Sequence, residues 1–179
     1  MADPIQTARL AYRLIYLLLA VLVIFLRLLP LDTTPTSWPG PNLLLCLCFA
    51  WVLRRPEYVP APLVALVFLA DDILSQRPPG LFAAIALLGS EFLRRREAMS
   101  RELTFLIEWL MVAGVMTAVF LAYRLGLAIT FVAQSNLSME TLQLVSTVVA
   151  YPLVVGLTRV GFGLRKAATG EVDAMGRRL

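Results

Sequence analysis

The sequence contains no histidine, and only 16% of its 179 residues are charged. The lack of histidine excludes histidine-based catalytic triads, histidine metal sites and most proton shuttles. A soluble domain usually carries about 25% charged residues, so this chain has too few to cover a water-facing surface. A phosphate-binding glycine motif is missing too, because Gly161-Phe162-Gly163 lacks the further glycine and the strand that such a motif needs. We therefore expect a protein that is not an enzyme and that uses no metal ion or cofactor.

Cysteine is also scarce, with Cys46 and Cys48 as the two copies, both inside an apolar run. Side chains two residues apart on a helix point about 200° apart. The pair can therefore neither form a disulfide nor share a metal ion. We interpret both as small apolar side chains that face helices or lipid.

The sequence is instead rich in apolar residues, at 59%, and its mean hydropathy is +0.79. These residues come in separate blocks, which is typical of membrane spans rather than of one soluble core. The first block is too long for the core of a signal peptide and lacks a small-residue cleavage site, so we expect a retained span. We predict one all-α membrane domain with a short basic cytoplasmic tail at 165–179 and six spans, at 10–29, 42–53, 61–74, 81–93, 103–123 and 141–164.

The second to fourth predicted spans are shorter than the 20 or so residues that a perpendicular crossing needs. Only 38 residues lie between Arg55 and Arg94, and they must supply two crossings and a turn. A re-entrant hairpin is the alternative, but it would keep Asp71, Asp72 and Arg77 deep in the membrane at a cost of several kcal/mol. We favour two full crossings.

Basic residues lie at the ends of the apolar blocks and form no patch with interleaved aromatic residues, so they do not indicate nucleic-acid binding. Such bordering charge sets the orientation of a membrane protein. With the N-terminus in the cytoplasm, thirteen of the sixteen basic residues fall on the cytoplasmic side. The exceptions are Arg27, Arg77 and Arg124. The pattern predicts a multi-pass inner-membrane protein with six spans and both termini in the cytoplasm.

Asp71 and Asp72 stand side by side near the end of the third predicted span. Adjacent helix residues point about 100° apart, so the two carboxylates cannot converge on one water as in intramembrane aspartyl proteases. We expect either solvation at the membrane interface or a bond to the backbone N–H groups that begin the fourth span. A proton or ion relay is a less favoured alternative.

Two glutamates lie at the ends of predicted spans. Glu91 stands three and four residues before Arg94 and Arg95, so we expect an ion pair at a helix end. Glu108 lies about two helical turns after Arg101. Its side chain is expected either to reach the interface or to bond a neighbouring helix or a partner protein.

Small residues recur every fourth position in the fifth predicted span, at Gly114, Ala118, Ala122 and Gly126. Such a stripe lets another helix approach closely. It either packs the span against its own neighbours or forms an interface with another protein. The sequence leaves both interpretations open.

The central stretch 41–93 shows a further pattern. Pro41 precedes a short apolar span with Trp51 near its end, Pro56 opens the next segment, and the following span ends in Asp72, with Gly80 eight residues later. This pattern resembles the rod shape-determining protein MreD family. The resemblance covers the central third of the chain, while the rest agrees in the size and spacing of its spans.

The resemblance implies a non-enzymatic membrane scaffold of the bacterial cell-elongation complex, with a six-helix fold similar to the substrate-binding (S) components of energy-coupling-factor vitamin transporters. Its direct partner would be MreC. Together they would help couple MreB filaments to a RodA-type glycosyltransferase and its class B penicillin-binding protein in peptidoglycan synthesis. Membrane lipid surrounds such a protein, and a homodimer is a further expectation. The alternative function is a small membrane transporter or the substrate-binding subunit of a vitamin-type transporter.

Overall fold

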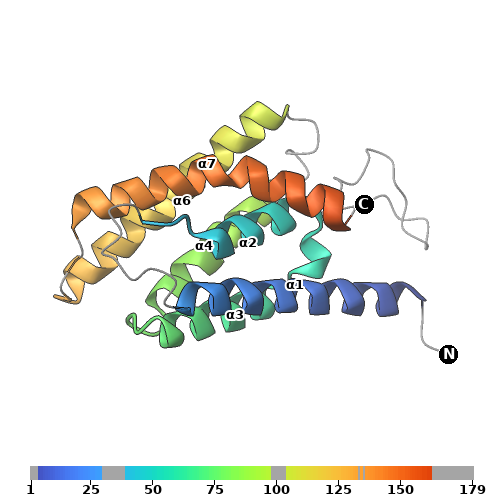
Figure 1. Ribbon diagram of the computed structural model, residues 1–179, viewed down its shortest axis with the longest axis horizontal. Helices are drawn as coiled ribbons and strands as arrows, with labels where there is room; N and C mark the ends of the chain where they lie inside the picture. The colour runs from blue at the N-terminus through green and yellow to red at the C-terminus, as the bar shows by residue number, and fades with distance from the viewer. Residues whose placement is uncertain (1–3, 30–38, 98–103, 133, 135, 163–179) are drawn as a thin grey trace.

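The computed structural model describes residues 4–29, 39–97, 104–132, 134 and 136–162, and this part of the chain is helical without a strand (Figure 1). The all-α prediction is confirmed. The predicted basic tail at 165–179 and Arg101 lie outside the described residues. The elements are α1 (Pro4–Leu28), α2 (Leu43–Arg54), the short 3-10 helix η1 (Pro56–Tyr58), α3 (Ala61–Leu74), α4 (Leu81–Arg95), α6 (Phe105–Ile129) and α7 (Leu137–Phe162).

Three of the described helices are long and apolar enough to cross a membrane. They are Gln6–Leu28 within α1, with 23 residues, and α6 and α7, with 25 and 26 residues. Each exceeds the 20 or so residues that span the hydrocarbon core of a bilayer. Their composition and length are those of a helical membrane protein.

The long helices extend beyond the apolar blocks that predicted them. α1 begins at Pro4, before the expected start at 10, and α7 begins at Leu137, before the expected start at 141. α6 continues to Ile129, past the expected end at 123. Hydropathy marks only the apolar part of a helix, whereas backbone hydrogen bonding carries the helix on through polar residues. Arg124 illustrates this, because it lies inside α6 and pairs with Glu140 on α7.

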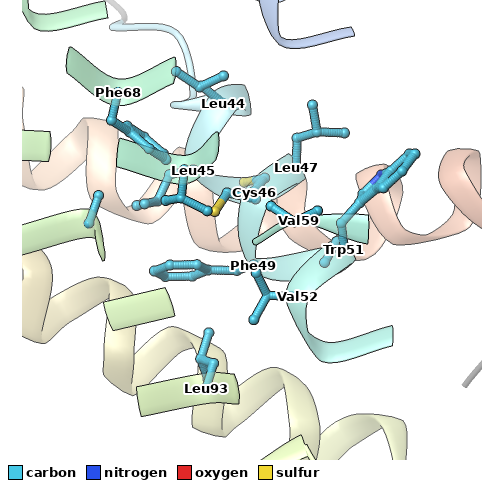
Figure 2. Packing of buried hydrophobic residues seen from close by; sticks show 14 of the residues in the cluster. Leu44, Leu45, Cys46, Leu47, Phe49, Trp51, Val52, Val59, Phe68 and Leu93 are labelled. Atoms are coloured by element: carbon cyan, nitrogen blue, oxygen red, sulfur yellow. The ribbon is translucent and has the colours of Figure 1, made fainter. Parts of the chain in front are cut away.

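Helix α2 forms the centre of the structure, between α7 on one side and α1 on the other (Figure 1). Every residue from Leu44 to Arg54 is buried, which is the pattern of a helix enclosed on all sides. Its 12 residues span about 18 Å at 1.5 Å per residue. Figure 2 shows its side chains packed with Phe68 of α3 and Leu93 of α4. The short second apolar block is therefore a core helix.

The two cysteines belong to this central helix and are free and buried. Cys46 donates its thiol proton to the carbonyl of Thr147 on α7 at 3.3 Å. The interpretation of both as small side chains facing helices is confirmed, and the lipid-facing alternative is wrong, because both side chains are 0% exposed.

Arginines hold the connection between α2 and α3 at one end of the bundle. Arg94 of α4 donates to the carbonyls of Pro56 at 2.9 Å and of Val59 at 2.6 Å. From α1, Arg13 donates to the Glu57 carbonyl at 3.2 Å. The Pro56 carbonyl also accepts the N–H of Val59 within η1, and the two arginines add charged donors from other helices to the carbonyls of this connection. We call this end, which carries η1, the η1 end.

A proline inside α7 is compensated by a tryptophan of α6. Pro152 has no N–H, so the carbonyl of Val148, four residues before it, lacks its usual helical donor. The indole Nε1 of Trp109 donates to this carbonyl at 2.9 Å. In an apolar environment an unsatisfied carbonyl is costly, so this hydrogen bond both repairs α7 and fixes its contact with α6.

Candidate functional site

The carboxylate of Asp72 closes the turn between α3 and α4. Its Oδ2 accepts hydrogen bonds from the backbone amides of Gly80 at 3.1 Å and Ala83 at 3.0 Å. A carboxylate at a helix N-terminus satisfies free N–H groups and complements the helix dipole. The expected bond from an aspartate to the start of the fourth span is therefore confirmed. Solvation at the interface is wrong for this residue, because its side chain is fully buried.

Gly80 is required by the backbone at this point. Its φ angle is +87°, in the left-handed region where a side chain would clash with the backbone. In this conformation the backbone N–H of Gly80 is directed at the Asp72 carboxylate. The eight-residue spacing of Asp72 and Gly80 in the sequence therefore corresponds to one structural device, a carboxylate that closes a helical hairpin.

Asp71 binds elsewhere, although it is the neighbour of Asp72. Its Oδ1 lies 3.4 Å from Nη1 of Arg27 on α1, and its Oδ2 lies 3.7 Å from Nη1 of Arg77. Ser75 donates to the same carboxylate at 3.3 Å. The side chain of Asp71 is 1% exposed, so interfacial solvation is wrong here too. The two aspartates face different partners, as expected for adjacent helix positions, and Asp71 ties α1 to α3.

Glu108 lies in a buried polar cluster at the crossing of three helices. Its Oε1 lies 3.3 Å from Nη2 of Arg54 on α2 and accepts a hydrogen bond from the Tyr151 hydroxyl of α7 at 3.3 Å. The side chains of Arg54 and Glu108 are 6% and 0% exposed. Of the alternatives for Glu108, a bond to neighbouring helices is therefore the one that the structure shows. The helix-end pair of Glu91 with Arg94 is confirmed at 2.9 Å.

The small-residue stripe of α6 divides into two parts. At Gly126 an added Cβ would lie 2.8 Å from Cδ1 of Leu81 on α4, so this end of the stripe packs within the chain. At Gly114 an added Cβ would meet nothing within 4 Å. Gly114, Ala118 and Ala122 are exposed. The intrachain interpretation therefore holds for Gly126, and the other three positions stay on the surface.

These three surface positions line an apolar groove of about 490 Å³ between α4 and α6, which we call the α4–α6 groove. Both helices contribute small residues, Gly89 on α4 and the three stripe positions on α6, and these leave space beside their larger neighbours. Its lining is almost entirely apolar: Ile85, Leu88, Gly89, Phe92, Met111, Gly114, Val115, Ala118, Val119 and Ala122.

A second cavity, of about 430 Å³, was not expected from the sequence. It lies where α2 and α7 begin, α3 turns into α4, and α6 ends, and we call it the turn-end cavity. Polar residues such as Asn42, Gln76, Gln143 and Thr147 contribute to its lining. Each of these residue types is common near a helix end. They indicate a cavity only once it is known that these helix ends lie together.

The other positions of the family pattern have structural roles. Trp51 is fully buried and packs between Tyr16 and Phe162, with ring centroids at 5.5 and 6.0 Å. Pro41 stands just before α2, and Pro56 begins η1. These residues set the ends and the packing of the central helix rather than a reactive site.

The fold and these sites define a small helical membrane protein with four buried charged residues, Arg54, Asp71, Asp72 and Glu108, in its described part. Within the described ranges no group of three His, Cys, Asp or Glu side chains is placed to hold a metal ion. No family model, curated protein or solved structure matches the chain.

Proposed function

We propose that this chain is a non-enzymatic membrane scaffold of the bacterial cell-elongation complex, of the MreD type, and that it binds the transmembrane helix of MreC. The observation that carries the proposal is the α4–α6 groove, which lies on the surface beside Gly114, Ala118 and Ala122 and has an apolar lining. The MreC helix lies in the α4–α6 groove. The complex helps couple MreB filaments to a RodA-type glycosyltransferase and its class B penicillin-binding protein.

The physics of helix association in lipid supports this use of the groove. Lipid tails are as apolar as the groove, so helix docking in a membrane depends on close packing rather than on the hydrophobic effect. Small residues four apart allow a helix backbone to approach closely, and larger neighbours supply dispersion contacts along its sides. Leu88 and Phe92, at 70% and 46% exposure, stand beside the small residues as such neighbours.

The hairpin device supports the family part of the proposal. The resemblance rests most specifically on the spacing of Asp72 and Gly80, and both residues take part in one interaction that closes the α3–α4 turn. An aspartate and a glycine at this spacing have a physical reason to occur together. The pair on which the resemblance most depends is therefore also a structural element of this chain.

For the whole chain we propose six crossings with both termini in the cytoplasm, in an arrangement similar to the substrate-binding components of energy-coupling-factor transporters. Support comes from the η1 end, where Arg9, Arg13 and Arg94 gather around one connection. Positive charge at one end of a bundle is typical of the cytoplasmic side. The short helices α2, α3 and α4 are then the thinner part of the bundle.

Copurification of MreC with Ala118→Leu tests the proposal. Leucine at this position fills the groove, and we expect recovery of MreC from membranes to fall at least about tenfold, which corresponds to about 1.4 kcal/mol of binding free energy. Ala128→Leu is the matched control, because Ala128 is exposed on the same helix and does not line the groove.

Equal recovery of MreC with the two variants, with both folded by thermal unfolding, would contradict the proposal. A transporter subunit that works without MreC predicts this result. It also predicts that Ala118→Leu leaves cell shape unchanged in a rod-shaped host, whereas the scaffold predicts rounding.

A further inference from the structure

We infer that the turn-end cavity binds one small uncharged amphipathic molecule, with its apolar body inside the bundle and its polar end at the rim. The volume of about 430 Å³ falls within the range of about 300–1,000 Å³ that is usual for small-molecule sites. The cavity draws on four helices, as a site between packed helices does. This inference does not rest on the proposed scaffold function, since it concerns a different cavity from the α4–α6 groove.

The inner part of the cavity is apolar. Leu45 of α2, Phe82 of α4 and Met116 and Val119 of α6 line it, and these four side chains are at most 6% exposed. Leu144 of α7 also lines the cavity. Side chains already held by the core form a preformed surface, so an apolar group enters without reorganising the bundle.

The rim of the cavity is rich in amide and hydroxyl groups, from Asn42, Gln76, Tyr123 and Gln143, which are all more exposed than the four buried side chains of the apolar lining. Such groups both donate and accept hydrogen bonds. Two of these side chains are held in place by the backbone: Asn42 Oδ1 accepts from the Leu45 N–H at 3.2 Å, and Gln143 Nε2 donates to the Gly40 carbonyl at 3.2 Å. A positioned set of donors and acceptors suits hydroxyl or amide groups of a ligand.

The charged residues of the lining already have opposite charges beside them. Arg77 faces the Asp71 carboxylate at 3.7 Å and lies 5.1 Å from the centroid of the Phe82 ring. Glu140 is paired with Arg124. An anion or a cation in the cavity would have to compete with these pairs and would lose its own hydration. This balance is the reason for an uncharged ligand.

The experiment uses the full chain in phosphatidylcholine nanodiscs and three probes with the same octyl chain: octyl glucoside, octanoate and octyltrimethylammonium. Each is titrated below its micelle-forming concentration while thermal unfolding is recorded, because a ligand of the folded state raises Tm in a saturable way. Leu144→Trp fills the cavity. Val145→Trp is the matched control, because Val145 is 56% exposed on the same helix.

We expect octyl glucoside to raise the Tm of the wild type and of Val145→Trp saturably, and to leave that of Leu144→Trp unchanged. The two charged probes should give no saturable shift. Should Leu144→Trp fail to fold, Tyr123→Phe serves instead, because it removes one rim hydroxyl. It should raise the concentration of octyl glucoside at half-saturation by about fivefold. The inference is overturned by equal shifts in both tryptophan variants, by saturable binding of a charged probe alone, by no shift with octyl glucoside, or by unchanged affinity in Tyr123→Phe.

Discussion

The carboxylate of Asp72 accepts the backbone N–H of Gly80 at 3.1 Å, which closes α3 and α4 into a hairpin. The same oxygen accepts from Ala83 at 3.0 Å, and the side chain is shielded from solvent. One buried carboxylate therefore satisfies two free N–H groups at the start of α4. The hairpin depends on this contact because neither amide has a helical acceptor so close to the helix start.

Replacing Asp72 with alanine should lower the free energy of unfolding by about 2 kcal/mol, because two buried amides lose their acceptor. Asp72→Asn keeps an acceptor oxygen and should recover more than half of this loss. Unfolding in mixed micelles measures both variants. Equal losses for alanine and asparagine would show that the charge, and not the acceptor, holds the turn.

Gly80→Ala should lower the free energy of unfolding by about 1–2 kcal/mol, because alanine resists the left-handed backbone at φ +87°. An added Cβ meets nothing within 4 Å there, so the loss comes from the backbone alone. Gly40→Ala is the control, since Gly40 has equal space and no left-handed φ. Equal stability of the two alanine variants in micelles would argue against a strained turn.

Glu108→Leu should destabilise the bundle by about 3–5 kcal/mol, because it leaves the Arg54 guanidinium buried without its carboxylate, 3.3 Å away in the wild type. The double variant Arg54→Met with Glu108→Leu removes both charges and should be clearly more stable than Glu108→Leu. Thermal unfolding of Arg54→Met, Glu108→Leu and the double variant gives the coupling free energy of the pair. Simple additivity of the two losses would mean that the pair does not interact.

Trp109→Phe should lower the free energy of unfolding by about 1–2 kcal/mol, since the Val148 carbonyl loses its donor in an apolar setting. In a Pro152→Ala background the same change should have a smaller effect. Alanine at 152 has an N–H that bonds to Val148, so the indole is no longer needed. An equal loss of stability in both backgrounds would show that Trp109 does not compensate for Pro152.

Gly126→Val should destabilise the chain by about 1–3 kcal/mol, because Leu81 stands 2.8 Å from the added Cβ and must move. Gly114→Val is the control on the same helix, as its Cβ meets nothing within 4 Å. The control should remain folded and should weaken MreC binding instead. Similar melting temperatures for both variants would contradict the division of the stripe.

Features that depend on near neighbours in the chain were predictable. The third apolar block at 61–74 coincides with α3, and the pair of Glu91 with Arg94 follows from their separation of three residues. The contact of Asp72 with the start of α4 was also predictable, because a short turn brings the two together. In each case the partners are within about a dozen residues, so local helix geometry places them.

Contacts between distant segments were not predictable from the pattern. Glu108 pairs with Arg54 and Tyr151, and Asp71 pairs with Arg27, across dozens of residues. The sequence showed charges in apolar segments but not their partners, because these depend on which helix faces meet. The turn-end cavity was not predictable for the same reason, because its lining comes from four helices.

The sequence alone therefore determined the class of protein, a helical membrane protein, because its apolar blocks are long and its charged residues are few. It also determined the positions of the short helices and of the Asp72–Gly80 turn. Only the tertiary structure decided that α2 is enclosed, that Glu108 is internal, and that part of the stripe on α6 borders an open groove. Helix crossing angles and side-chain volumes set these outcomes, and they depend on all the helices together.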